Sequence, residues 1–142
     1  MTGKTPWIVA GAAAAALAGV LVVSRPQPAP PGAPVGHSST HPDPRAGVTA
    51  QQVLPNAFVP RTPGSTEAYA AARQAPATLD GVYCYCDCSK HAGHRSLLTC
   101  FETNHGAYCD VCMAEAVLAV RMSGQGQSLE EIRAAIDRQF GS

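Results

Sequence analysis

The sequence is poor in charge and in aromatic side chains. Asp, Glu, Lys and Arg make up 14% of its 142 residues, and Phe, Trp and Tyr make up 6%. The formal net charge is zero, and the sequence has no basic stripe with interleaved aromatics, so nucleic-acid binding is not expected. From Gly64 onward, the sequence has six Lys and Arg residues and nine Asp and Glu residues, which gives a net charge of −3. An acidic domain of this kind suits a protein that binds cations.

The sequence also lacks the motifs of common enzyme classes. It has no serine, histidine and acid set, no phosphate-binding loop and no pair of catalytic carboxylates, so hydrolase and kinase chemistry are not supported. Cysteine is concentrated instead, because all six cysteines lie between Cys84 and Cys112. Thiolates are soft ligands and nucleophiles, so this window predicts a site that binds a soft metal or exchanges disulfides.

Residues 1–24 are expected to form a membrane anchor or signal segment. Trp7 to Val23 is an unbroken apolar stretch flanked by Lys4 and Arg25, about the minimum length of a spanning helix. A small-residue cleavage signal exists at Ala16-Leu17-Ala18, but cleavage there would leave an apolar new terminus. We expect an uncleaved single-pass anchor with the domain on the extracytoplasmic side. The alternatives are a cleaved signal, which would give a secreted or periplasmic protein, and a buried helix.

Residues 25–63 are rich in proline and are expected to form a disordered, extended linker that holds the domain away from the membrane. His37 and His41 lie in this segment. They are expected to be solvated linker histidines, with a weak accessory metal tether as the alternative.

Residues 64–142 are expected to form a small, mainly α domain with a Cys-rich loop, stapled by metal, by disulfides or by both. One helix should begin at Ser65 or Thr66 and end near Gln74, because Pro76 follows. A second should run from near Cys109 to Met122. The last helix is predicted most directly, because Ser128-Leu129-Glu130-Glu131 is a capping box, and an Arg133 to Asp137 pair is expected on its polar side.

Cys84, Cys86 and Cys88 occupy alternate positions. In an extended segment these three side chains would share one face, and neighbouring cysteines would lie about 6.6 Å apart at the backbone. This separation is long for a disulfide, so pairing within the triplet is not expected unless the chain turns there.

Cys109 and Cys112 form a Cys-x-x-Cys pair at an expected helix start, an arrangement used by metal sites and by dithiol redox sites. Together with the triplet, Cys100 and the nearby His91 and His94, they form our candidate metal ligand set. Copper(I) is the expected metal and zinc the alternative, because six cysteines exceed one zinc site. His105 is expected to be a polar loop residue, and Met113 and Met122 are expected to pack in the core.

Two other interpretations remain open. An even cysteine count outside the cytoplasm is typical of disulfides, and six cysteines allow fifteen pairings of three disulfides. Alternatively, Cys109 and Cys112 would be the exchanging pair of a thiol-disulfide oxidoreductase, which predicts a depressed thiol pKa. A disulfide-stapled domain could also serve as an interaction surface for a membrane partner.

Several separated motifs carry a family resemblance: Cys84-Tyr85-Cys86-Asp87-Cys88, His91-x-x-His94 with Arg95-Ser96-Leu97, Cys100-Phe101, Cys109-x-x-Cys112, and Ser128-Leu129-Glu130-Glu131-Ile132-Arg133. Over roughly Glu67 to Gly141 the chain resembles the CYCXC, or PCYCGC-motif, family of bacterial extracytoplasmic proteins, some of which are thought to carry selenocysteine. Tyr83 stands where many relatives have proline and Asp87 where they have glycine, which predicts a local difference in the turn. The resemblance implies the location, the fold and soft-metal or redox chemistry, but no settled activity.

The sequence therefore predicts an extracytoplasmic, membrane-anchored protein that sequesters or transfers a soft metal. Its expected partners are the metal ion, the membrane and an unidentified protein that exchanges metal or thiols with it. No catalytic residue is assigned outside the redox alternative.

Overall fold

The computed structural model describes residues 40–141. The expected anchor, His37 and the first part of the proline-rich segment lie outside the described residues. Within 40–141, no helix has both the length and the apolar character needed to cross a membrane.

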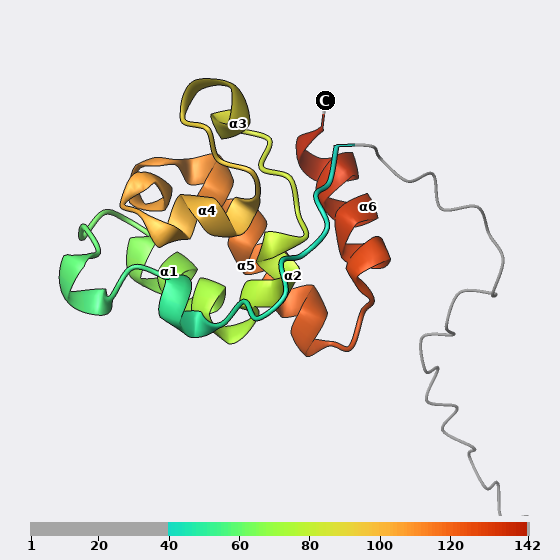
Figure 1. Cartoon of the computed structure of the whole chain (residues 1–142), viewed down its shortest axis with the longest axis horizontal. Coiled ribbons are helices and arrows are strands. Elements are labelled where there is room, and N and C mark those ends of the chain that lie inside the picture. The colour runs from blue at the N-terminus through green and yellow to red at the C-terminus, as the bar shows by residue number, and fades with distance from the viewer. Residues whose placement is uncertain (1–39, 142) are drawn as a thin grey trace, which may run out of the picture. The chain divides into compact units, whose positions relative to one another are not determined.

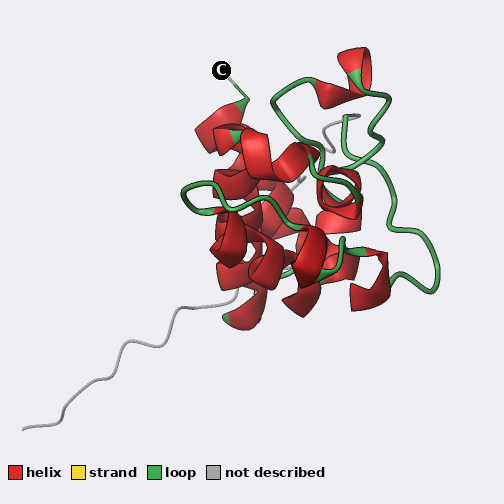
Figure 2. Ribbon diagram, turned by 90° about the vertical axis from the view of Figure 1, so that its left-hand side faces the viewer, coloured by secondary structure: helices red, strands yellow, loops and turns green. Residues whose placement is uncertain are grey.

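The described part of the chain consists of helices and loops, without strands (Figure 2). The prediction of a mainly α domain is therefore confirmed. Two short 3-10 helices come first, then six α-helices with a third 3-10 helix before α5 (Figure 1). Their bounds are η1 Ala50–Gln52, η2 Asn56–Phe58, α1 Ser65–Gln74, α2 Pro76–Asp80, α3 Cys88–His91, α4 Leu97–Glu102, η3 His105–Tyr108, α5 Asp110–Gly124 and α6 Leu129–Phe140.

The helix ends follow local signals in the sequence. At the start of α6, Ser128 Oγ accepts the Glu131 N–H and Glu131 Oε2 accepts the Ser128 N–H at 2.8 Å, which is the predicted capping box. Gly64, at φ 80°, precedes α1. Pro76 ends that helix but also begins α2, because proline is well suited to the first position of a helix.

The core forms where α1 packs against α5 and α5 packs against α6 (Figure 1). Ala68 and Ala72 of α1 and Ala116 and Ala119 of α5 are all fully buried. Small side chains allow the helix backbones to approach closely, which stabilises a small domain. The same core includes Cys84, Cys88, Cys100 and Cys112, so the buried cysteines are part of the packing rather than an appendage to it.

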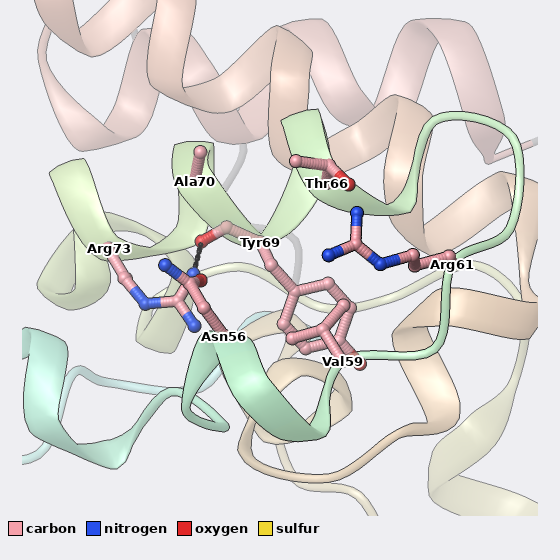
Figure 3. A pocket seen from close by; sticks show the side chains of 7 residues that line it. All are labelled: Asn56, Val59, Arg61, Thr66, Tyr69, Ala70 and Arg73. Carbon is pink, nitrogen blue, oxygen red and sulfur yellow. Dashed lines mark hydrogen bonds between the residues drawn. The ribbon is translucent and has the colours of Figure 1, made fainter.

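Residues 40–63 differ from the extended spacer expected over 25–63. Val53 is buried in the core, and the Leu54 N–H donates to the Phe101 carbonyl at 2.8 Å. Arg73 of α1 donates to the carbonyl oxygens of Leu54 and Tyr69, the second of which is drawn in Figure 3. Proline permits this packing because the segment forms short 3-10 turns, one of which directly follows Pro55.

His41 is also not a solvated linker residue, since its side chain is 2% exposed. Its Nδ1 accepts the Tyr83 N–H at 2.9 Å, and its Nε2 lies 2.7 Å from Asp137 Oδ1. Asp137 is thus engaged by His41, and Arg133 instead pairs with Glu130 at 2.8 Å. The expected Arg133 to Asp137 pair is replaced because a segment distant in sequence reaches the same face of α6.

A buried carboxylate ties the same segment to the helices. Asp80 is fully buried, and the Arg45 and Arg95 guanidinium groups each lie 2.9 Å from one of its oxygens. Ser96 Oγ donates to it at 2.9 Å. Burial raises the pKa of Asp80, but the hydrogen bonds from Arg45 outweigh this and hold the pKa below its usual range.

Candidate metal centre

The cysteine triplet lies on a turn. Residues 85 and 86 form the turn, Asp87 adopts the left-handed conformation with φ 57°, and α3 begins at Cys88. The turn brings Cys84 Sγ and Cys86 Sγ to 3.5 Å, much closer than an extended segment would allow. The three thiols therefore form a compact group instead of a spaced row.

Helices α4 and α5 bring two more thiols to this turn. Cys112 Sγ of α5 lies 3.4 Å from Cys84 Sγ and 3.6 Å from Cys86 Sγ, and Cys100 Sγ of α4 lies 3.3 Å from Cys88 Sγ. All six cysteines are free thiols. A disulfide has sulfurs about 2.05 Å apart, whereas sulfurs on one tetrahedral zinc at about 2.3 Å lie roughly 3.8 Å apart. The observed spacing is closer to that of ligands around an ion.

The sixth thiol, Cys109, is the N-cap of α5. Its Sγ accepts the Cys112 N–H at 3.4 Å, so the sulfur serves as the cap of the helix. Cys109 is partly exposed, unlike Cys112. The Cys-x-x-Cys pair thus spans the boundary between the core and the surface.

Two histidines complete the group. His94 Nδ1 lies 3.3 Å from Cys100 Sγ, and His105 Nε2 lies 3.8 Å from Cys86 Sγ. Burial lowers the pKa of both imidazoles, which favours the neutral form that binds metals. His105 lies at the site, although we expected it to be a polar loop residue. In the sequence, its position four residues before Cys109 was the one sign that His105 belongs to the site.

His91 stands apart from the other candidates. It is exposed, and its ring centroid lies 6.0 Å from that of His105. The ligand atoms of the other candidates form four overlapping groups, within each of which all atoms lie within 4.8 Å of one another. The groups are Cys86, His105, Cys109 and Cys112; Cys88, His94, Cys100 and His105; Cys84, Cys86 and Cys88; and Cys84, Cys100 and Cys112.

We define the cluster as the six cysteines with His94 and His105. Two of its thiols, those of Cys109 and Cys112, resist ionisation in the metal-free protein because their pKa values are raised. Burial raises the pKa of Cys109 above its usual value despite its place at a helix N-terminus. Contact with Cys100, together with burial, raises the pKa of Cys112. Several thiolates cannot be placed this close in a low-dielectric environment unless a cation compensates their charge.

Glu115 is a second residue that the sequence analysis missed. It follows Cys112 by one helical turn on α5, is fully buried, and accepts the Tyr85 N–H at 2.9 Å through Oε1. Its Oε2 has no hydrogen-bond partner within the described residues. Burial raises the pKa of Glu115 to about 7. An acidic residue in the middle of an Ala- and Val-rich helix was the signal in the sequence.

Replacing Glu115 by Gln should reduce the pH dependence of stability in the reduced, metal-free protein. A pKa of about 7 in the folded state, above the ordinary value of 4.5, means that folding is favoured by the protonated form. This contribution is complete below pH 4.5 and is lost as the pH rises through 7, a loss of at most about 3 kcal/mol. Urea unfolding at pH 5 and pH 8 measures it.

In this comparison, Glu115→Gln should lose less stability than the unsubstituted protein between the two pH values. The matched control is Glu130→Gln on α6, a residue outside the cluster. Identical pH dependence of the unsubstituted protein and Glu115→Gln would contradict the assignment.

A profile for proteins of unknown function with a PCYCGC motif matches residues 31–142. The chain belongs to this family. No curated protein and no solved structure matches the chain. The family assignment confirms the resemblance drawn from the separated motifs, and it extends the matched region to include the segment that packs around Arg45 and His41.

The structure explains one residue of the family motif. Aligned with PCYCGC, Asp87 occupies the place of the glycine, and its φ of 57° is in the region that glycine adopts without steric cost. Asp is among the side chains that tolerate this conformation, and here Asp87 Oδ1 accepts the Tyr83 O–H at 2.8 Å. The turn that gathers the thiols therefore keeps its shape without glycine.

Tyr83 occupies the place of the motif proline. Its N–H donates to His41, a bond that proline could not make. The Tyr83 to His41 hydrogen bond therefore links the cysteine turn to residues 40–63.

A separate cavity of about 420 Å³ lies beside Tyr69 and is lined by Asn56, Val59, Arg61, Thr66, Tyr69, Ala70 and Arg73 (Figure 3). Its lining has two guanidinium groups and no Cys, His, Asp or Glu side chain. It is therefore unsuited to a metal ion, and the cluster is the stronger candidate site.

Proposed function

We propose that this protein binds soft metal ions, copper(I) foremost, through its Cys and His cluster, and sequesters or transfers them on the extracytoplasmic side of a membrane. The observation that carries the proposal is the convergence of six free thiols and two imidazoles, in which five of the sulfurs lie 3.3 to 3.6 Å from a neighbouring sulfur. The apolar stretch from Trp7 to Val23 supports the membrane location. The alternative location is the periplasm or the medium after cleavage.

Copper(I) is favoured over zinc by the donor set. Copper(I) accepts two or three thiolates, and sulfur outnumbers nitrogen in the cluster by six to two. Zinc prefers four ligands in a tetrahedron, and the group of Cys86, His105, Cys109 and Cys112 is an adequate set for it. Zinc is therefore the second metal to test for binding to the protein.

Thiol-disulfide exchange is the second candidate function, because Cys109 is partly exposed at the start of α5. Burial raises the pKa of Cys109, however, and an attacking thiol needs a pKa near or below neutral. A rate of reaction with a thiol reagent no faster than that of a model thiol would exclude this candidate. The disulfide alternative would pair the closest thiols, Cys88 with Cys100 and Cys84 with Cys112.

The proposal is tested by metal analysis of the full-length protein in mild detergent. The protein is reduced under anaerobic conditions, offered copper(I) or zinc, separated from unbound metal and measured for metal per chain. We expect stoichiometric copper in the unsubstituted protein and a clear reduction in copper per chain in a Cys86→Ser, Cys112→Ser double variant. Met122→Leu, which removes a sulfur outside the cluster, is the matched control and should retain copper.

Far-UV circular dichroism establishes that the double variant keeps its helices. Absence of stoichiometric copper and zinc from the reduced, unsubstituted protein would refute the proposed function. A metal-free protein lighter by six hydrogens, formed even with copper present, would favour three disulfides instead.

A further inference from the structure

The donors of the cluster divide into two adjoining sets, each of which gathers within 4.8 Å. The inner set is Cys88, His94 and Cys100, and the outer set is Cys86, Cys109 and Cys112. Within the inner set, Cys100 Sγ lies 3.3 Å from both Cys88 Sγ and His94 Nδ1. The ligand atoms of the outer set lie within 4.8 Å of one another. His105 is within this distance of every donor in both sets.

We propose that the cluster binds two copper(I) ions, one in each set, with the Cys84 thiolate bridging them. This inference rests on the proposed function and adds the stoichiometry and the separate roles of the two ions. Eight donors exceed what one ion can use, because copper(I) takes two or three thiolates and zinc takes four ligands. Each set by itself supplies enough donors for one ion.

Cys84 occupies the position expected of a bridge. Its sulfur lies 3.4 Å from that of Cys112 and 3.5 Å from that of Cys86, both in the outer set. It also lies within 4.8 Å of the sulfurs of Cys88 and Cys100 in the inner set. A thiolate has several lone pairs, so one sulfur can bind two soft ions at once, and each thiol that binds releases its proton to solvent.

The two sets differ in their access to solvent. Cys88 is 1% exposed and Cys100 is 0% exposed, so an ion held by them is enclosed by the core. In the outer set Cys112 is fully buried, but Cys86 and Cys109 are partly exposed, as is the shared His105. A ligand of an acceptor protein or chelator can therefore reach an outer ion from the side of Cys86 and Cys109. The outer ion is therefore the exchangeable cargo, and the inner ion is retained.

The experiment measures both the number of ions and their rates of release from the reduced, full-length protein. Native mass spectrometry should detect two copper ions per chain. Excess bathocuproine disulfonate should then remove them in two phases of equal amplitude, the slower by about tenfold or more because the inner set must open first. This behaviour of the unsubstituted protein decides the question even if a variant fails to fold.

Double substitutions assign each phase. Cys86→Ser, Cys112→Ser should lose the fast phase and keep the slow one, and Cys88→Ser, Cys100→Ser should do the reverse, with circular dichroism as the check on folding. His91→Ala, outside both sets, is the matched control and should retain two ions and two phases.

Retention of one ion per chain, or release of two ions in a single phase, would overturn this inference while leaving the proposed function intact. Retention of no ion would refute both the proposed function and this inference.

Discussion

Saturating copper(I) should raise the midpoint of thermal unfolding of the reduced protein by roughly 15–30 °C. The donors come from four separate places: the turn after α2, the segment from α3 to α4, η3 and the start of α5. Only the folded chain brings them within bonding distance of one ion. At a free ion concentration a thousand times the dissociation constant, binding contributes about 4 kcal/mol to the free energy of unfolding.

Differential scanning calorimetry with and without a buffered copper(I) source measures this shift. The Cys86→Ser, Cys112→Ser double variant should lose a substantial part of it, and Met122→Leu should retain it. An unchanged midpoint at saturating copper would mean that the folded cluster has no advantage over the unfolded chain. Thiols of the unfolded chain also bind copper, which sets the lower end of the range.

Arg45→Met should lower the free energy of unfolding of the metal-free protein by about 3 kcal/mol. The substitution keeps most of the aliphatic stem but removes the guanidinium that pairs with the fully buried Asp80. Arg95 remains 2.9 Å from the other Asp80 oxygen, and Arg45 itself is 40% exposed, so the loss should lie at the lower end for a broken buried pair.

Urea unfolding followed by far-UV circular dichroism gives this difference. Lys90→Met, which breaks the exposed pair with Asp87, is the matched control and should cost at most about 0.5 kcal/mol. Asp80→Asn in the Arg45→Met background should restore part of the loss, because the amide carries no uncompensated charge. Equal effects of Arg45→Met and Lys90→Met would indicate that the pair of Arg45 with Asp80 does not stabilise the domain.

The local elements of this fold could be predicted because their signals lie within a few residues of one another. The capping box of Ser128 and Glu131 defines the start of α6 regardless of its neighbours. Pro76 likewise ends α1 at the expected place. The gathering of all six cysteines in one window indicates the sulfur site independently of any tertiary contact.

The packing of residues 40–63 could not be predicted in the same way. Proline content alone indicates an extended linker, but Arg45 and His41 are held by partners 35 and 96 residues away in the sequence. No local pattern signals such contacts. The family match from residue 31 onward is consistent with a domain that begins before Gly64.

The sequence by itself determined the helical class, the family and the thiol-rich site, since helix signals are local and the cysteines are close along the chain. Only the tertiary structure decided which donors meet. It turned the Cys84 to Cys88 segment at Asp87, brought in His105 and left out His91, although His91 is nearer to the triplet in sequence. It also placed Glu115 beside the thiols. The physical reason is that ligand geometry depends on how α4, η3 and α5 pack around the turn, and packing is a property of the whole core.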